Sequence, residues 1–199
     1  MLLRRVGLTI ALACLAGPAD AHIVASRLGD FYAGALHPLT DPRDPLLWVA
    51  AGVLGATSGA ARARWLVLLF PAGLLTGLIV GASLHLTADP LLLDAGMMVL
   101  LGGLLASAVR MPAVVLFAIV LALGVLRGTA NAAGLAPETN QLVFAAGFVT
   151  IGYLVITLTM GLTTAFREPD ISWRGIAIRA GGSWIVAIGL MAGGYAIIL

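Results

Sequence analysis

Histidine and acidic side chains are the groups in this chain that could do chemistry. If the chain spans a membrane with the topology that its arginines indicate, eight such residues share one side: His22, His37, His85, Asp30, Asp41, Asp44, Asp89 and Glu138. Imidazole and carboxylate groups bind divalent transition metals such as nickel, cobalt and copper, and a net acidic surface concentrates cations. The pattern predicts a metal-binding surface; the alternative is a solvated loop surface whose charges are incidental.

His22 draws attention because of the segment before it. Residues 1–21 combine two arginines near the start, a short apolar stretch and small residues at Ala19 and Ala21, which is the order of a cleavable signal peptide. Cleavage makes His22 the N-terminal residue, whose amine and imidazole can chelate a divalent cation together. Two alternatives stay open: residues 1–21 form an uncleaved first span, or His22 merely follows the cut.

Asp94 lies a few residues inside an apolar stretch, where an ionised side chain facing lipid would cost several kcal/mol. We therefore expect it to face protein or water. It is either a cation ligand or proton-coupling carboxylate, or a residue that caps the start of its helix.

Residues 31–45 are apolar enough to enter a membrane but too rich in proline to form one straight helix. Such a broken element is tolerated only where protein or a water-filled cavity surrounds it, which places His37 and Asp44 in a candidate cavity. Asp44 can equally serve as the cap of the helix that follows. The predicted metal ligands are therefore His22, His37, His85, Asp44 and Asp94.

The elements that must position these groups are membrane helices. Hydrophobic residues make up 61% of the 199, charged residues 10%, and the mean hydropathy is +1.07, which leaves too little polar surface for a water-soluble globule. We predict an all-α fold in which residues 22–199 form one polytopic transmembrane bundle. Its six expected spans are 46–61, 65–84, 91–109, 112–126, 142–164 and 176–199. The first and fourth are short, so we expect them to extend into flanking residues.

Arginine placement predicts the orientation. With the mature N-terminus in the periplasm of a bacterium, six arginines fall at the cytoplasmic ends of the spans and three outside, in agreement with the positive-inside rule. The cytoplasmic set is Arg62, Arg64, Arg110, Arg167, Arg174 and Arg179. The predicted location is the bacterial inner membrane.

Some function classes are disfavoured. The eleven arginines are scattered through short loops and do not form the basic face that nucleic-acid binding requires. No nucleophile paired with a base, phosphate loop or two-histidine helix motif is visible, so we do not expect an enzyme. The expected partners are the lipid bilayer, a metal ion and a larger membrane complex.

The segment 31–40, FYAGALHPLT, together with a signal peptide, a histidine after the cut and a short-looped helical bundle, resembles the HupE/UreJ family over essentially the whole length. The resemblance implies a membrane protein of nickel or cobalt acquisition associated with hydrogenase or urease maturation. It implies a small metal permease or a metal-delivery accessory.

The chain departs from the family pattern at two places. Asp41 stands where a glycine is expected, and Arg43-Asp44 stands where the family has Asp-His. A histidine-rich cluster of the family corresponds to residues 127–131, which contain no histidine.

Arg43 and Arg127 therefore stand at positions where the family pattern leads us to expect metal ligands. A fixed positive charge there would make metal binding less favourable by a few kcal/mol. Both could instead form buried ion pairs, Arg43 with Asp94 or Arg127 with Asp44. The alternative function is accordingly a non-transporting subunit or scaffold of a larger membrane complex.

Overall fold

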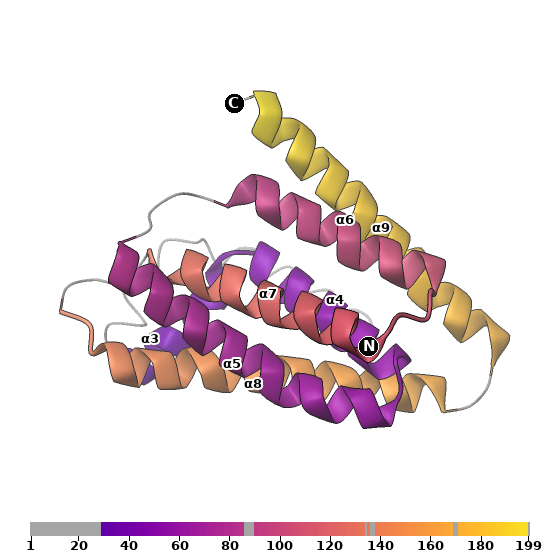
Figure 1. Cartoon of the computed structure of the whole chain (residues 1–199), viewed down its shortest axis with the longest axis horizontal. Helices are drawn as coiled ribbons and strands as arrows, with labels where there is room; N and C mark the ends of the chain where they lie inside the picture. The colour runs from indigo at the N-terminus through magenta and orange to yellow at the C-terminus, as the bar shows by residue number, and fades with distance from the viewer. Residues whose placement is uncertain (1–28, 86–89, 134, 136–137, 169–170, 199) are drawn as a thin grey trace, which may run out of the picture.

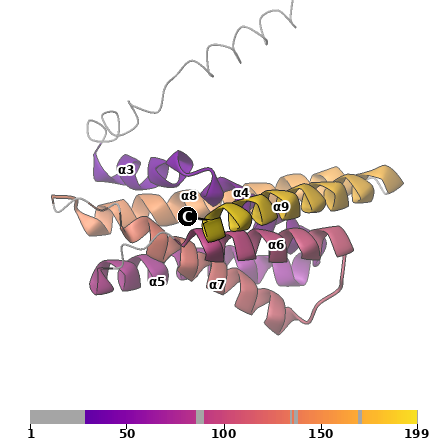
Figure 2. The same ribbon diagram turned by 90° about the horizontal axis from the view of Figure 1, so that it is seen from above.

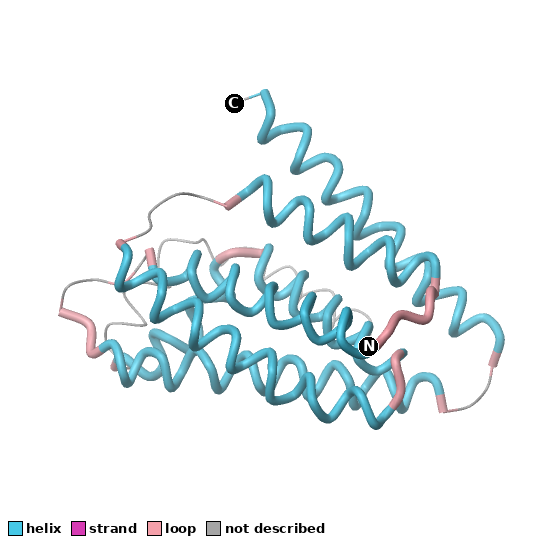
Figure 3. Tube along the Cα trace, viewed as in Figure 1, coloured by secondary structure: helices cyan, strands magenta, loops and turns pink. Residues whose placement is uncertain are grey.

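A computed structural model of the protein describes residues 29–85, 90–133, 135, 138–168 and 171–198. Every regular element in these ranges is helical (Figure 3). The all-α prediction is thus confirmed for the described part of the chain. The predicted signal peptide, His22 and Asp89 lie outside the described residues.

The described part of the chain begins with a short broken element and continues as six longer helices. The broken element consists of α3 (Asp30–Leu36) and the 3-10 helix η2 (His37–Thr40). The longer helices are α4 (Arg43–Thr57), α5 (Ala60–Leu84), α6 (Leu91–Ser107), α7 (Ala113–Ala132), α8 (Gln141–Arg167) and α9 (Ser172–Ile198).

Four of these helices are long and apolar enough to cross a membrane: α5, α7, α8 and α9. Helix α6 is also apolar but has 17 residues, and α4 has 15. The chain is therefore a membrane protein with at least these four candidate spans, and the count of six stays a prediction.

Of the two stretches that were expected to lengthen, the fourth does so, whereas the first is shifted: α4 ends at Thr57, before residue 61, and has 15 residues. Helix α4 begins at Arg43 rather than at residue 46, and α7 continues through Arg127 to Ala132 rather than ending at residue 126. A charge normally marks the limit of an apolar span, but a buried charge that is paired can stay inside a helix. Both helices thus carry ionic side chains within their length.

The tightest helix pairs join helices that are not neighbours in the sequence. Helix α5 packs along α7, α6 packs along α9, and α8 packs against α3, α4 and α5. Figures 1 and 2 show α6 and α9 running side by side, with α9 at the edge of the bundle. Only Gly182 and Gly189 of α9 are buried, so one long apolar helix is covered by protein along a narrow stripe.

Glycines allow the close approach of α5 and α7. A Cβ atom added at Gly73 or Gly77 would collide with the backbone of α7 at Leu121 or Val125, and one at Gly124 would collide with Phe70 of α5. The same holds for α9, where Gly189 meets α6. The small-residue spacing therefore works as a packing signal, as such spacings do in membrane bundles.

The core between α4, α5 and α8 is aromatic. Trp48 packs edge-on against Phe70, with ring centroids 5.5 Å apart, and against Phe148 at 5.9 Å. All three side chains are fully buried. This cluster fixes α4, and with it the polar residues of the first turn of α4.

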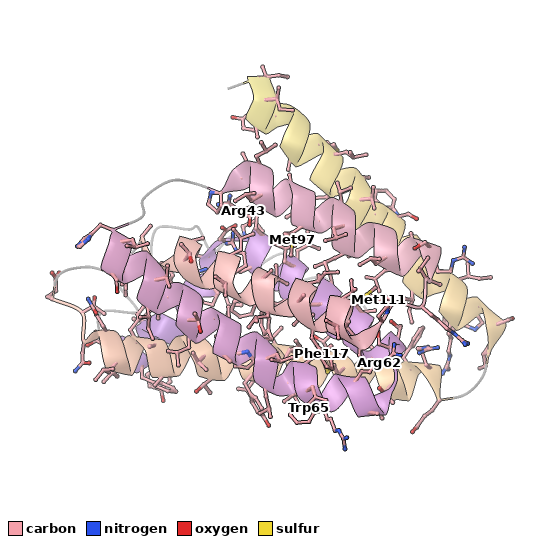
Figure 4. All side chains as sticks on the ribbon, viewed as in Figure 1. Arg43, Arg62, Trp65, Met97, Met111 and Phe117 are labelled. Atoms are coloured by element: carbon pink, nitrogen blue, oxygen red, sulfur yellow. The ribbon has the colours of Figure 1, made fainter. Side chains whose placement is uncertain are left out.

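The bundle has two chemically different ends. At one end, the connections α4–α5, α6–α7 and α8–α9 surround a common cavity; we call it the arginine end. At the opposite end, α4 and α6 begin and the last turns of α7 lie, with carboxylate groups on α4 and α6; we call it the carboxylate end. Figure 4 shows Arg43 toward the carboxylate end and Arg62 at the arginine end.

Candidate functional site: a buried ion-pair network

Arg127 of α7 is the centre of the carboxylate end. Its side chain is 2% exposed, and its guanidinium donates to three different carboxylates. The Nε atom lies 2.7 Å from Asp44 Oδ1, Nη1 lies 2.5 Å from Asp94 Oδ2, and Nη2 lies 3.0 Å from Asp41 Oδ2. All three nitrogen atoms of the guanidinium are thus used.

Asp44 and Asp94 reach this point from the starts of two helices. Each lies in the first turn of its helix, α4 or α6, and each side chain is 0% exposed. The residues at the N-cap positions are Pro42 and Pro90, so neither aspartate is itself the cap residue. The positive end of a helix dipole stabilises a carboxylate in the first turn, which offsets part of the cost of burying it.

Arg43 and Asp41 extend the network to the partly exposed surface. Arg43 Nε donates to both oxygens of Asp41, at 3.0 and 2.9 Å, and Arg43 Nη1 lies 3.3 Å from Asp94 Oδ2. The backbone N–H of Arg43 also donates to Asp41 Oδ1 at 2.9 Å, which shapes the turn between η2 and α4. One carboxylate oxygen of Asp94 therefore faces two guanidinium groups.

Asn131 completes the network one helical turn after Arg127. Its Nδ2 donates to Asp44 Oδ2 at 2.9 Å and to the Arg127 carbonyl oxygen at 2.8 Å. Because residues four apart lie on one face of a helix, the side chains of Arg127 and Asn131 both donate to the carboxylate of Asp44. Both oxygens of Asp44 are consequently satisfied.

The network carries unequal charge. Three carboxylates and two guanidinium groups give a formal charge of −1 when all are ionised. Asp94 Oδ1 is buried and has no hydrogen-bond partner among the described residues. Asp94 is therefore the one carboxylate of the network that keeps an unpaired oxygen.

The charges of the network affect the pKa of Asp41, which lies at its partly exposed edge. Burial of Asp41 works to raise the pKa of its carboxyl group, but hydrogen bonds from Arg43 and the charges of Arg127 and Arg43 outweigh it, so the pKa is lowered. Asp41 is accordingly held as a carboxylate at neutral pH.

The structure brings two of the predicted metal ligands together and places two others elsewhere. Asp44 and Asp94 both bind Arg127. The half-buried His37 ring packs edge-on against Phe144 of α8, with centroids 5.6 Å apart. His85 is exposed, and its backbone N–H caps α5 by donating to the Gly81 carbonyl oxygen. Within the described ranges, no three histidine, cysteine or acidic side chains are arranged to hold a metal ion.

Sequence reasoning found part of this network. The pairs Arg127–Asp44 and Arg43–Asp94 were considered as an alternative to metal ligation, and both are present. The direct contact of Arg127 with Asp94 and the role of Asn131 were not predicted. The four-residue spacing of Arg127 and Asn131 on one helix was the signal that could have revealed Asn131.

A comparison with protein families matches residues 10–192 of the chain to the model described as HupE / UreJ protein. No curated protein and no solved structure matches the chain.

Proposed function

The chain belongs to the HupE/UreJ family, and we propose that it handles a divalent transition metal of the nickel and cobalt class in the bacterial inner membrane. The family implies a nickel or cobalt accessory or permease-type membrane protein. Beyond that, we propose a permease or a metal-delivery accessory whose site faces the periplasm. The proposed ligands are His22, His37, His85, Asp44 and Asp94.

One observation carries this proposal: the carboxylates of Asp41, Asp44 and Asp94 converge on a single positive group inside the bundle. Three acidic groups directed at one point form an environment that stabilises a cation. In the structure that cation is the guanidinium of Arg127. A metal ion would have to displace Arg127 or use the oxygen of Asp94 that Arg127 leaves unpaired.

The same observation supports a second candidate function. Arg127 donates from all three nitrogens of its guanidinium. The network could therefore serve only to hold helices together. A non-transporting membrane subunit would use the network only to hold α4, α6 and α7 together. The largely uncovered α9 would then face other proteins of a larger complex or lipid.

Metal binding by the purified full-length protein separates the two functions. The protein, processed or not at residue 21, is titrated with Ni²⁺ and Co²⁺ in detergent, and uptake is followed after reconstitution into phospholipid vesicles. We expect binding that is weakened in His22→Ala and in Asp94→Asn, the latter because it removes a carboxylate that already carries an unpaired oxygen.

Glu138→Gln is the matched control, because Glu138 is an exposed acidic residue without a contact in the network. It should bind metal like the unchanged protein. If the folded wild-type protein binds neither metal, the permease and delivery functions are excluded and the scaffold function remains.

A further inference from the structure

In the part of the chain that the structure describes, a group of arginines without carboxylate partners lies at the arginine end, away from the ion-pair network. The ends of α4, α6 and α8 and the starts of α5 and α9 line a partly open cavity of about 720 Å³ there. This volume is typical of sites for small ligands, which range over roughly 300–1,000 Å³. Four arginines line it: Arg62, Arg110, Arg167 and Arg179.

No described carboxylate neutralises these four arginines. Among the described residues, none of them forms an ion pair with a carboxylate, whereas Arg43 and Arg127 at the other end are paired. The connections around the cavity thus carry a local charge that an external anion can balance.

Two of the four arginines are held in place by backbone carbonyl groups. Arg62 Nη1 donates to the Met111 carbonyl oxygen at 3.0 Å, and Arg179 Nε donates to the Ala106 carbonyl oxygen at 2.9 Å. Figure 4 shows Arg62 beside Met111. Both bonds use one nitrogen of a guanidinium that has several more N–H groups, so each arginine keeps donors for a ligand.

The side chains of the other two arginines donate no hydrogen bond to any described residue. Arg110 lies in the α6–α7 connection and Arg167 at the last turn of α8, and both are exposed. They come from different connections and still line the same cavity. Their guanidinium groups are available to an anion that enters between them.

The remaining wall of the cavity points to the kind of anion. It includes Leu104, Leu105, Val109 and Ile176, which are apolar and lie at the ends of apolar helices. Helix ends of this kind lie at the level of lipid headgroups, and basic pockets between membrane helices bind anionic headgroups there. A soluble anion needs only the arginines, whereas a phospholipid also covers the apolar wall.

We propose that this cavity binds the phosphate group of an anionic phospholipid, with Arg62, Arg110, Arg167 and Arg179 as its ligands and the apolar wall in contact with the acyl chains. The bound lipid joins the three connections of the arginine end, because the four ligands lie on α5, α8, α9 and the α6–α7 connection.

The test uses the full-length protein in a neutral detergent. Phosphatidylglycerol, cardiolipin, phosphatidylcholine or inorganic phosphate is added, and native mass spectrometry measures the lipid retained while thermal unfolding measures the rise in Tm. We expect retention and a rise in Tm with the two anionic lipids only. An equal response to phosphatidylcholine or to inorganic phosphate alone would overturn the assignment to an anionic lipid.

Arg110→Gln combined with Arg167→Gln is the decisive variant, because neither side chain supports the fold through a hydrogen bond to a described residue. At about 1 kcal/mol for each arginine near an anionic headgroup, the double variant should bind the anionic lipids roughly 25-fold more weakly. The single Arg110→Gln should bind roughly 5-fold more weakly, which keeps the test valid if the double variant does not fold.

Arg64→Gln is the matched control. Arg64 lies near the start of α5 at the same end of the bundle, but its guanidinium stands over the Trp65 ring and does not line the cavity. It should bind the anionic lipids as the unchanged protein does. If Arg64→Gln weakens binding as much as Arg110→Gln, the effect is one of general surface charge and the cavity is not the site.

Discussion

The two ends of the bundle use arginine in opposite ways. At the carboxylate end, Arg127 is buried and donates to three carboxylates of the same chain. At the arginine end, Arg110 and Arg167 are exposed, and no described carboxylate pairs with them. Arginine therefore pairs with carboxylates of the chain at one end. At the other end, its guanidinium groups are accessible to an anion from outside the chain.

This difference follows from where the acidic residues lie. Asp44 and Asp94 are each within the first turn of a helix that begins at the carboxylate end, where the helix dipole favours a negative charge. The last turns of helices favour positive charge, and at the arginine end Arg167 occupies such a turn. Helix direction thus accounts for Asp44, Asp94 and Arg167, but not for Arg62, which lies in the first turn of α5.

The largest effect is expected from Arg127→Met. This change removes a buried cation, leaves Asp44 without a charged partner and leaves Asp94 with Arg43 alone, which should lower the free energy of unfolding by about 3–5 kcal/mol. Arg110→Met, the corresponding change at the arginine end, should alter it by no more than about 0.5 kcal/mol. Thermal and denaturant unfolding in detergent measure both, and equal effects would show that the two ends do not differ.

A neutralised network should be more stable than a broken one. In the triple variant Asp44→Asn, Asp94→Asn and Arg127→Gln, no buried charge is left without a partner, so most of the stability lost in Arg127→Met should return. The same unfolding measurement compares the two variants. A triple variant as unstable as Arg127→Met would mean that shape, and not charge, makes Arg127 necessary.

Asn131→Leu should have a smaller effect. It leaves Asp44 Oδ2 without the donor that now lies 2.9 Å away, and an unsatisfied buried acceptor costs about 1–3 kcal/mol. Thr76→Val is the control, because the Thr76 hydroxyl donates only to the Ala72 carbonyl oxygen within its own helix. Similar losses in the two variants would contradict a specific role for Asn131.

The smallest effect concerns pH. The pKa of Asp41 is lowered in the folded protein, because the hydrogen bonds and charges of Arg43 and Arg127 outweigh its burial. Its contribution to stability is therefore complete above the unfolded pKa of about 3.9, and is lost as the pH falls through the lower folded value. Unfolding measured from pH 6 down to about pH 3 should show a shallower decline in Asp41→Asn. An unchanged slope would mean that Asp41 does not contribute.

The helices were predictable because long apolar stretches in this chain leave no other structure for the backbone. Their ends were less predictable, since α4 already begins at Arg43, before its expected start, and Arg127 lies inside α7, beyond its expected end. Whether an arginine ends a helix depends on a partner far away in the sequence, such as Asp44 for Arg127, 83 residues apart. Local composition does not contain that information.

The site was predictable in its pairs but not in its geometry. The placement of arginines at expected ligand positions suggested that Asp44 and Asp94 have ionic partners, and they do. The guanidinium of Arg127 binds both aspartates because α4, α6 and α7 cross near it. The periodicity of apolar residues in the sequence does not specify how helices cross. The lining of the cavity by Arg110 and Arg167 depends likewise on how three connections meet.

The pairing of α6 with α9 has a consequence for biosynthesis. The glycine face of α6 at Gly102 fits against Gly182 and Val186, which the ribosome makes about eighty residues later. Until α9 enters the bilayer, that face has only lipid or a chaperone of membrane insertion to cover it. The contact between α6 and α9 therefore forms late in biosynthesis, after the other described helices have been made.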